Sequence, residues 1–206
     1  MLNVYYRKHG IEPDYEVFRS KGFSPQWSAK TKTRALEFQS LPPFLRTLLV
    51  TDGTVTKALE AYYWEPVQVD TVFQEFVQAE ADIDWLDVRS GDEVLSRRVN
   101  LRGRARSTVY AKAYSILRSS LIPTQLRAQL LAGTLGIGEL IRDCGLETYR
   151  ELLEIGLTTA EDELDPGDAT LGAVYRTYRI VLGGRPAILV TEHFPLDVFL
   201  PATSAV

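Results

Sequence analysis

Two expected strands joined around Gly103 limit the possible folds of this chain more than any other feature. Apolar and polar side chains alternate along Glu93–Arg102, as they do in a run that begins at Val67, and Ser107–Leu117 follows as the expected paired strand. Such alternation is typical of strands with one buried face, and a short break at a glycine favours a hairpin. The sequence therefore predicts an antiparallel sheet, because strands joined by short turns pair in opposite directions.

Helices and further strands complete the predicted fold. Short helices are expected at Leu41–Val50, Thr54–Tyr63, Pro123–Leu131 and Ile137–Cys144. Three later strands, of which the last two flank a Gly-Gly-Arg-Pro turn, are expected at Thr148–Thr159, Thr170–Leu182 and Ala187–Phe194. Sequential hairpins with helices in two clusters predict an α+β fold, in which an antiparallel β-sheet has helices on one side.

The chain divides into two parts by its periodicity. Residues 1–39 have no sustained period and are expected to form an N-terminal arm or adaptor segment. Residues 40–206 are long enough to bury a core of their own and are expected to form one domain. Within that domain the acidic stretch Glu80–Asp92 is expected to be a solvated connection.

Charge and composition exclude several classes of function. The net charge of −4 gives no field that would attract nucleic acid. The single cysteine, Cys144, suits a reducing compartment, and one cysteine with two histidines leaves little for a transition-metal site. No apolar run approaches the roughly 18–20 residues that span a bilayer, and no phosphate-binding glycine loop is present. We therefore expect a cytoplasmic protein with no metal, no cofactor, no nucleic-acid partner and no membrane span.

The polar face of the first hairpin strand holds two arginines, Arg98 and Arg102, whereas Arg97 shares the opposite face with leucine and valine. A planar guanidinium on a rigid strand suits bidentate binding of a carboxylate. The two arginines lie roughly 13 Å apart along the strand, so they can hold opposite ends of a pocket but not one carboxylate together. The alternative is an ordinary solvated strand face.

Glu192 and Lys57 are the other charged candidates. Glu192 lies within the otherwise apolar run Ala187–Phe194, where a buried carboxylate is costly unless it is paired or protonated. The alternative for Glu192 is an outward position near the end of a strand. Lys57 lies just inside a helix start, where a lysine and a helix N-terminus can bind an anion together, or it is a solvated surface lysine.

Four short stretches carry a resemblance to a known family. They are Leu48–Lys57, Arg98–Arg102, Gly136–Gly138 together with Arg150–Gly156, and Gly184–Glu192. In order and approximate spacing, over about residues 40–200, they resemble the chorismate pyruvate-lyases, which convert chorismate to 4-hydroxybenzoate and pyruvate. The resemblance implies a cofactor-free lyase whose antiparallel sheet carries helices and flap loops over an internal ligand site. It also implies a place in quinone biosynthesis (ubiquinone or plastoquinone) or in other phenolic biosynthesis.

The resemblance implies roles for individual residues. Arg102 falls at the family's substrate-carboxylate arginine and Glu192 at its active-site glutamate, so both are expected to be catalytic. Val55 and Ile137 fall where apolar residues line the family's pocket. Arg102 would bind a carboxylate of chorismate and stabilise the leaving enolpyruvyl group. Glu192 would bond the hydroxyl that becomes the phenol, or act as a base.

The remaining expectations concern helpers and alternatives. Arg98 and Lys57 are additional candidates for substrate binding, and a largely pericyclic elimination, with the protein supplying orientation, is a further mechanism. A non-catalytic alternative is the effector-sensing domain of some bacterial transcription regulators, which resembles the same fold and binds small molecules without converting them. Against it, residues 1–39 are too short and unpatterned for a winged-helix segment. A third interpretation is an arginine face that binds an acidic partner.

Overall fold

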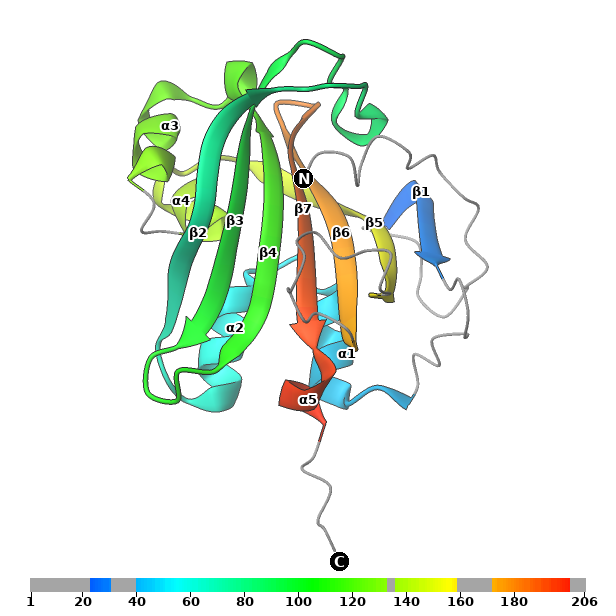
Figure 1. Cartoon of the computed structure of the whole chain (residues 1–206), viewed down its shortest axis with the longest axis vertical. Coiled ribbons are helices and arrows are strands. Elements are labelled where there is room, and N and C mark those ends of the chain that lie inside the picture. The colour runs from blue at the N-terminus through cyan, green and yellow to red at the C-terminus, as the bar shows by residue number, and fades with distance from the viewer. Residues whose placement is uncertain (1–22, 31–39, 133–135, 159–171, 201–206) are drawn as a thin grey trace, which may run out of the picture.

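A seven-stranded sheet dominates the computed structural model, which describes residues 23–30, 40–132, 136–158 and 172–200 (Figure 1). The order across the sheet is β1-β5-β6-β7-β4-β3-β2. Neighbours among β2 to β7 are antiparallel, and β1 pairs in parallel with β5. The strands are β1 (Phe23–Lys30), β2 (Val67–Gln78), β3 (Glu93–Gly103), β4 (Val109–Arg118), β5 (Thr148–Leu157), β6 (Ala173–Leu182) and β7 (Arg185–Pro195).

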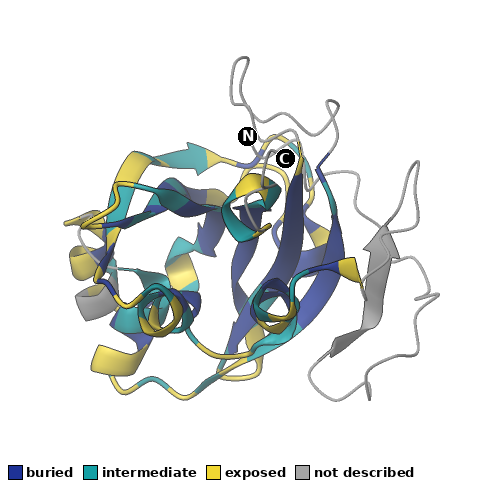
Figure 2. Cartoon of the chain, turned by 90° about the horizontal axis from the view of Figure 1, so that it is seen from below, coloured by how far each residue is buried: buried dark blue, intermediate teal, exposed yellow. Residues whose placement is uncertain are grey.

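Helices cover one face of this sheet, as Figures 1 and 2 show. The helices are α1 (Pro43–Val50), α2 (Val55–Tyr63), α3 (Thr124–Leu131), α4 (Ile137–Asp143) and the short α5 (Leu196–Phe199), with 3-10 turns η3 (Asp84–Leu86) and η4 (Ser119–Leu121). Leucines of α1 and α2 pack with apolar residues of β3, β4, β6 and β7 in the main core. The predicted α+β fold, an antiparallel sheet with helices on one side, is confirmed. Within the described ranges no helix is long and apolar enough to cross a membrane.

Strand periodicity sorts the residues of β7 onto the two faces of the sheet. Ile188, Val190 and Phe194 belong to the main core under the helices, whereas Leu189 belongs to a second apolar cluster. Glu192 has the same parity as the first group, so its carboxylate is turned toward the helices. The turn that leads into β7 consists of two glycines with φ of 55° and 76°, a backbone conformation that glycine adopts without steric cost.

The acidic stretch Glu80–Asp92 differs from its prediction as a solvated connection. Its aspartates are exposed, but Ile83, Trp85, Leu86 and Val88 are buried and form the second apolar cluster with residues of the sheet. The prediction was wrong because it weighed the charge of the whole stretch. The apolar residues between the charges turn inward, and this short segment closes part of the sheet that the helices leave open.

Part of the predicted N-terminal arm belongs to the sheet. Phe23–Lys30 forms β1 and pairs with β5, for example through Ser28 and Glu154. The rest of residues 1–39 lies outside the described ranges. The division at residue 40 stays a prediction, and β1 shows that the sheet extends across that boundary.

Gly103 lies where the backbone passes two buried side chains at the β3–β4 turn. Glu65 accepts hydrogen bonds from the backbone amides of Ala105 at 2.6 Å and Arg106 at 3.1 Å. Tyr110 donates its hydroxyl to the same carboxylate. A Cβ at position 103 would lie 2.7 Å from Oε1 of Glu65 and 2.7 Å from a ring carbon of Tyr110.

The substitution Gly103→Ala is therefore expected to lower the free energy of unfolding by about 1–3 kcal/mol, the usual cost of overpacking. Neither neighbour can move without breaking the bonds that hold the turn. Urea unfolding followed by circular dichroism measures the effect. Gly136→Ala is the matched control, since its Cβ would meet Val69 at an ordinary 3.6 Å. Equal losses in the two variants would contradict the account of this turn.

Candidate active site

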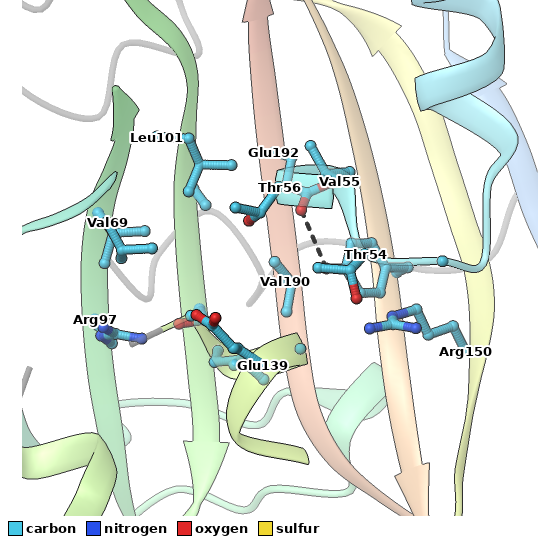
Figure 3. Close-up of a pocket in the computed structure, with 18 residues that line it drawn as sticks. Thr54, Val55, Thr56, Val69, Arg97, Leu101, Glu139, Arg150, Val190 and Glu192 are labelled. Atoms are coloured by element: carbon cyan, nitrogen blue, oxygen red, sulfur yellow. Dashed lines mark hydrogen bonds between the residues drawn. The ribbon is translucent and has the colours of Figure 1, made fainter. Parts of the chain in front are cut away.

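A pocket lies between the helix-bearing face of the sheet and the first residues of α2 and α4 (Figure 3). Each of the six antiparallel strands contributes to its wall, from Val69 on β2 to Arg150 on β5. Residues 53–56 and 136–139 line it from the helix side. The antiparallel sheet thus brings residues from distant parts of the sequence to one cavity.

Glu192 lines this pocket from β7 and is held by two residues of β6. Its Oε2 accepts a hydrogen bond from Nε of Arg176 at 2.7 Å, and its Oε1 accepts one from the hydroxyl of Tyr178 at 3.2 Å. The ion pair is buried, with side-chain exposures of 8% for Glu192 and 1% for Arg176. The guanidinium balances the charge of the carboxylate and so reduces the cost of its burial. Since an ionised carboxylate offers about four acceptor positions, Glu192 can still accept hydrogen bonds from a ligand.

The ion pair is held in place by a further contact of Arg176 and by the protonation state of Tyr178. Arg176 donates from Nη1 to the backbone carbonyl of Thr51 at 2.6 Å, which ties β6 to the end of α1. Burial, followed by the negative charge of Glu192, raises the pKa of Tyr178 above its usual range. The hydroxyl of Tyr178 therefore keeps its proton and remains a donor to Glu192.

Arg97 enters the pocket from β3. Its side chain is almost completely buried, with an exposed fraction of 1%, and its Nη2 donates to Oγ1 of Thr71 at 3.3 Å. Burial lowers the pKa of Arg97 to about 10, which leaves it charged at neutral pH. The register joins Arg97 to Ser115 and Ser115 to Val190, two positions before Glu192. Arg97 is thus two strands from β7, roughly 10 Å across the sheet.

Arg150 enters the pocket from β5. It donates from Nη1 to the backbone carbonyl of Asp52, and its guanidinium lies 5.9 Å from the centre of the Tyr178 ring. Figure 3 shows Arg97 and Arg150 on opposite sides of the pocket. Two cations therefore face the cavity in addition to the one that pairs with Glu192. In the described part of the chain, no three histidine, cysteine or carboxylate residues could together hold a metal ion.

The structure places three of the six predicted site residues in the pocket lining. They are Val55 at the start of α2, Ile137 at the start of α4 and Glu192 on β7. Although 137 positions separate Val55 from Glu192 in the sequence, the fold brings them to one cavity.

The other three predicted residues lie outside the pocket lining. Arg102 is on the opposite face of β3, where its Nε donates to Asp70 at 2.7 Å and its Nη1 to the carbonyl of Ser107 at 2.8 Å. Arg98 shares that face and lies over the ring of Tyr114. The side chain of Lys57 is 61% exposed and pairs with a glutamate one turn further along α2. The structure therefore does not bring Arg102 together with Glu192, and the arginine of β3 that lines the pocket is Arg97.

Arg97 was not among the predicted site residues because the prediction favoured the polar face of β3. The pattern that indicates Arg97 is a single arginine at alternating spacing among the apolar residues of the other face. The same pattern marks Arg176, which alternates with Val174, Tyr178 and Ile180 on β6. A charged residue on a face that must be buried requires a partner or a ligand, so it indicates a site more strongly than arginines on a solvated face.

A sheet-lined pocket with a paired glutamate and two further arginines is suited to a small acidic molecule, and sequence comparisons identify the family. Residues 49–200 match the family described as chorismate pyruvate-lyase Rv2949c-like. The chorismate pyruvate-lyase of Mycobacterium leprae is 31% identical over 166 residues, covering 79% of this chain and 79% of that protein. The chorismate pyruvate-lyase of Mycobacterium tuberculosis strain H37Rv is 27% identical over 172 residues, covering 81% and 86%. The chain belongs to the Rv2949c-like chorismate pyruvate-lyase family.

Two solved structures with the same fold are both of the protein PhnF. PhnF from Mycobacterium smegmatis aligns with a TM-score of 0.54 at 16% identity, over 73% of this chain and 67% of that one. The effector domain of PhnF alone aligns with a TM-score of 0.50 at 16% identity, over 70% and 90%. At such identities the likeness shows a shared fold and nothing about the ligand.

Proposed function

We propose that this protein is a lyase that converts chorismate to 4-hydroxybenzoate and pyruvate. The observation that carries the proposal is the pocket in which buried Arg97 and buried Glu192 both take part, in a chain that belongs to the chorismate pyruvate-lyase family. Chorismate has a carboxylate at one end of its ring and a hydroxyl at the opposite end. A cation and a hydrogen-bond acceptor two strands apart match these two groups.

In this proposal Arg97 binds the ring carboxylate and Glu192 accepts a hydrogen bond from the ring hydroxyl. Arg97 is proposed for the role that the family resemblance implied for Arg102, because Arg97 is buried in the pocket and Arg102 is paired with Asp70 outside it. A guanidinium in a poorly solvated site binds a carboxylate strongly. The apolar residues between the two groups, among them Val190 and Leu101, contact the ring. The protein thus orients the substrate and excludes water.

The reaction is then an elimination within the bound substrate. The ether bond between the ring and the enolpyruvyl oxygen breaks, and its electron pair forms the carbonyl of pyruvate. The terminal CH2 carbon of the enolpyruvyl double bond takes the hydrogen from the hydroxyl-bearing ring carbon. This CH2 carbon thereby becomes the methyl group of pyruvate. The electron pair of that C–H bond completes the aromatic ring. All atoms of chorismate are accounted for in the two products, and no net oxidation or reduction occurs.

Turnover of chorismate by the purified protein tests the proposal. Pyruvate should appear many times faster than in the spontaneous reaction, with one 4-hydroxybenzoate for each pyruvate. Chorismate deuterated at the hydroxyl-bearing carbon should give singly deuterated pyruvate methyl groups. Pyruvate release at the background rate would refute the lyase assignment. Turnover without deuterium transfer would refute the direct hydrogen transfer and assign Glu192 the role of a base.

The second candidate is a domain that binds a small effector without converting it. It is favoured by the fold shared with the effector domain of PhnF, at a TM-score of 0.50. The same preparation distinguishes the two, because an effector domain would bind an acidic ligand in calorimetry and release no pyruvate. If the protein is a lyase, we also propose that it is located in the cytoplasm and takes part in phenolic or quinone biosynthesis.

The pH dependence of catalysis follows from the pKa of Arg97. The free enzyme has this guanidinium charged below pH about 10 and loses the charge as the pH rises through that value. We expect kcat/KM for chorismate to fall above pH about 10, while kcat changes less, because bound carboxylate keeps Arg97 protonated. Steady-state kinetics between pH 7 and 10.5, with circular dichroism to confirm folding, measures this. A constant kcat/KM across that range in folded protein would contradict the lowered pKa of Arg97.

A further inference from the structure

Arg150 is a cation in the pocket wall that the proposed reaction has not yet used. Its Nη1 reaches the carbonyl of Asp52, and its Nε is buried without a hydrogen-bond acceptor in the described part of the chain. None of the ion pairs within the described residues includes Arg150. Arg150 as a whole is half-buried, but its buried Nε is costly unless a ligand supplies an acceptor.

The position of Arg150 separates it from Arg97 across the sheet. Four strand spacings lie between β5 and β3 in the order β5-β6-β7-β4-β3, so Arg150 and Arg97 approach the cavity from opposite walls. Figure 3 shows this arrangement. Arg150 also packs against the start of α4, where its Nη2 would lie 3.2 Å from a Cβ added to Gly138. The guanidinium is thereby kept at the side of the cavity away from Arg97.

The cations of the pocket lining can be matched to the two carboxylates of chorismate. Glu192 is neutralised by Arg176 at 2.7 Å. Glu139 also lines the cavity and lies 3.8 Å from Arg142, at the limit of an ion pair. Arg97 and Arg150 are the two cations of the lining, and chorismate carries two carboxylates, one on the ring and one on the enolpyruvyl group. With Arg97 on the ring carboxylate, Arg150 is left for the second.

We infer that Arg150 binds the carboxylate of the enolpyruvyl group and makes the pocket select the dianionic substrate over the monoanionic aromatic product. This inference rests on the proposed function. The second carboxylate leaves with pyruvate, so 4-hydroxybenzoate is held by Arg97 and Glu192 and makes no ion pair with Arg150. Arg150 is thus a specificity determinant whose contribution is present for the substrate and absent for the product.

Paired binding measurements on Arg150→Gln test the inference. The dissociation constants of 4-hydroxybenzoate, and of chorismate where turnover is slow enough, are measured by calorimetry, and KM for chorismate by pyruvate release. We expect chorismate binding to weaken roughly 30-fold, the usual effect of losing a charged hydrogen bond. The affinity for 4-hydroxybenzoate should stay within about 3-fold of wild type, and Arg150→Lys should recover part of the chorismate affinity because it keeps the charge.

Three outcomes would overturn the inference: equal weakening of both ligands, which indicates a structural role, no weakening of either, or loss of 4-hydroxybenzoate binding alone. Circular dichroism confirms that each variant is folded, and Arg97→Met serves as the comparison that should weaken both ligands. Failure of the proposed function is recognised separately. If wild-type protein binds chorismate but releases no pyruvate, the ratio of the two affinities in the Arg150 variants still decides the role of Arg150.

Discussion

Glu192→Gln is expected to lower kcat/KM for chorismate by about 100-fold or more. Glutamine has nearly the same shape, but it replaces a charged acceptor of the ring hydroxyl with a neutral one, and such preorganised electrostatic contacts contribute on this scale. The same change leaves the guanidinium of Arg176 buried without its counter-charge at 2.7 Å. We therefore also expect the free energy of unfolding to fall by about 3 kcal/mol.

The double variant Glu192→Gln/Arg176→Met separates these two effects. Removing both charges eliminates the unpaired buried cation, so stability should return to within about 1 kcal/mol of wild type. Activity should stay low, because Glu192 is still absent. Urea unfolding and pyruvate release measure the two quantities. Recovery of activity together with stability would show that Glu192 acts only through the fold.

Arg97→Met is expected to weaken chorismate and 4-hydroxybenzoate alike, each by a factor on the order of 100 to 1,000. Both ligands carry the ring carboxylate, and removing one partner of a buried charge pair costs about 2–5 kcal/mol. Arg102→Met is the matched control, because it removes the same side chain from the same strand on the face outside the pocket. The control should change both affinities by less than about 3-fold. A larger effect of Arg102→Met than of Arg97→Met would restore Arg102 as the carboxylate-binding residue.

Arg97→Met is also expected to leave the protein at least as stable as wild type. Burial lowers the pKa of Arg97 to about 10 from its usual 12.5, so the folded state disfavours the cation. This cost, on the order of 3 kcal/mol, is fully present below pH about 10 and disappears as the pH rises through the unfolded value. Methionine occupies the space of the apolar part of the arginine side chain and carries no charge. A large loss of stability at pH 7 would assign Arg97 a structural role.

Most of the fold was predictable because the alternation of side chains in strands and the residues that begin and end helices are local properties of the sequence. The strand that begins at Val67, the hairpin around Gly103 and the Gly-Gly turn before β7 all lie where the sequence places them. The second apolar cluster was not predicted, since Trp85 and its neighbours lie among aspartates that dominate the charge of the stretch. The order of the strands was not predictable from periodicity either, because pairing of β4 with β7 depends on contacts distant in sequence.

The candidate site was predictable in part. Glu192 could be found because a carboxylate in an apolar strand is costly without a partner, although that partner, Arg176, was not identified. Among the arginines of β3, the prediction favoured the polar face, whereas the arginine that lines the pocket is Arg97 on the other face. Parity along a strand tells which residues share a face, but only packing tells which face bears the helices. Arg97 belongs to the pocket because the first residues of α2 and α4 cover the face of β3 on which it lies.

A crystal structure of the protein with bound 4-hydroxybenzoate would show whether Arg97 and Glu192 hold the two ends of the ligand. We predict the ring carboxylate within about 3 Å of the Arg97 guanidinium and the phenol oxygen within hydrogen-bond distance of the Glu192 carboxylate. Arg102 should remain paired with Asp70 outside the site. A ligand bound on the Arg102 face of β3, or bound in the pocket with its carboxylate toward Glu192, would contradict the account.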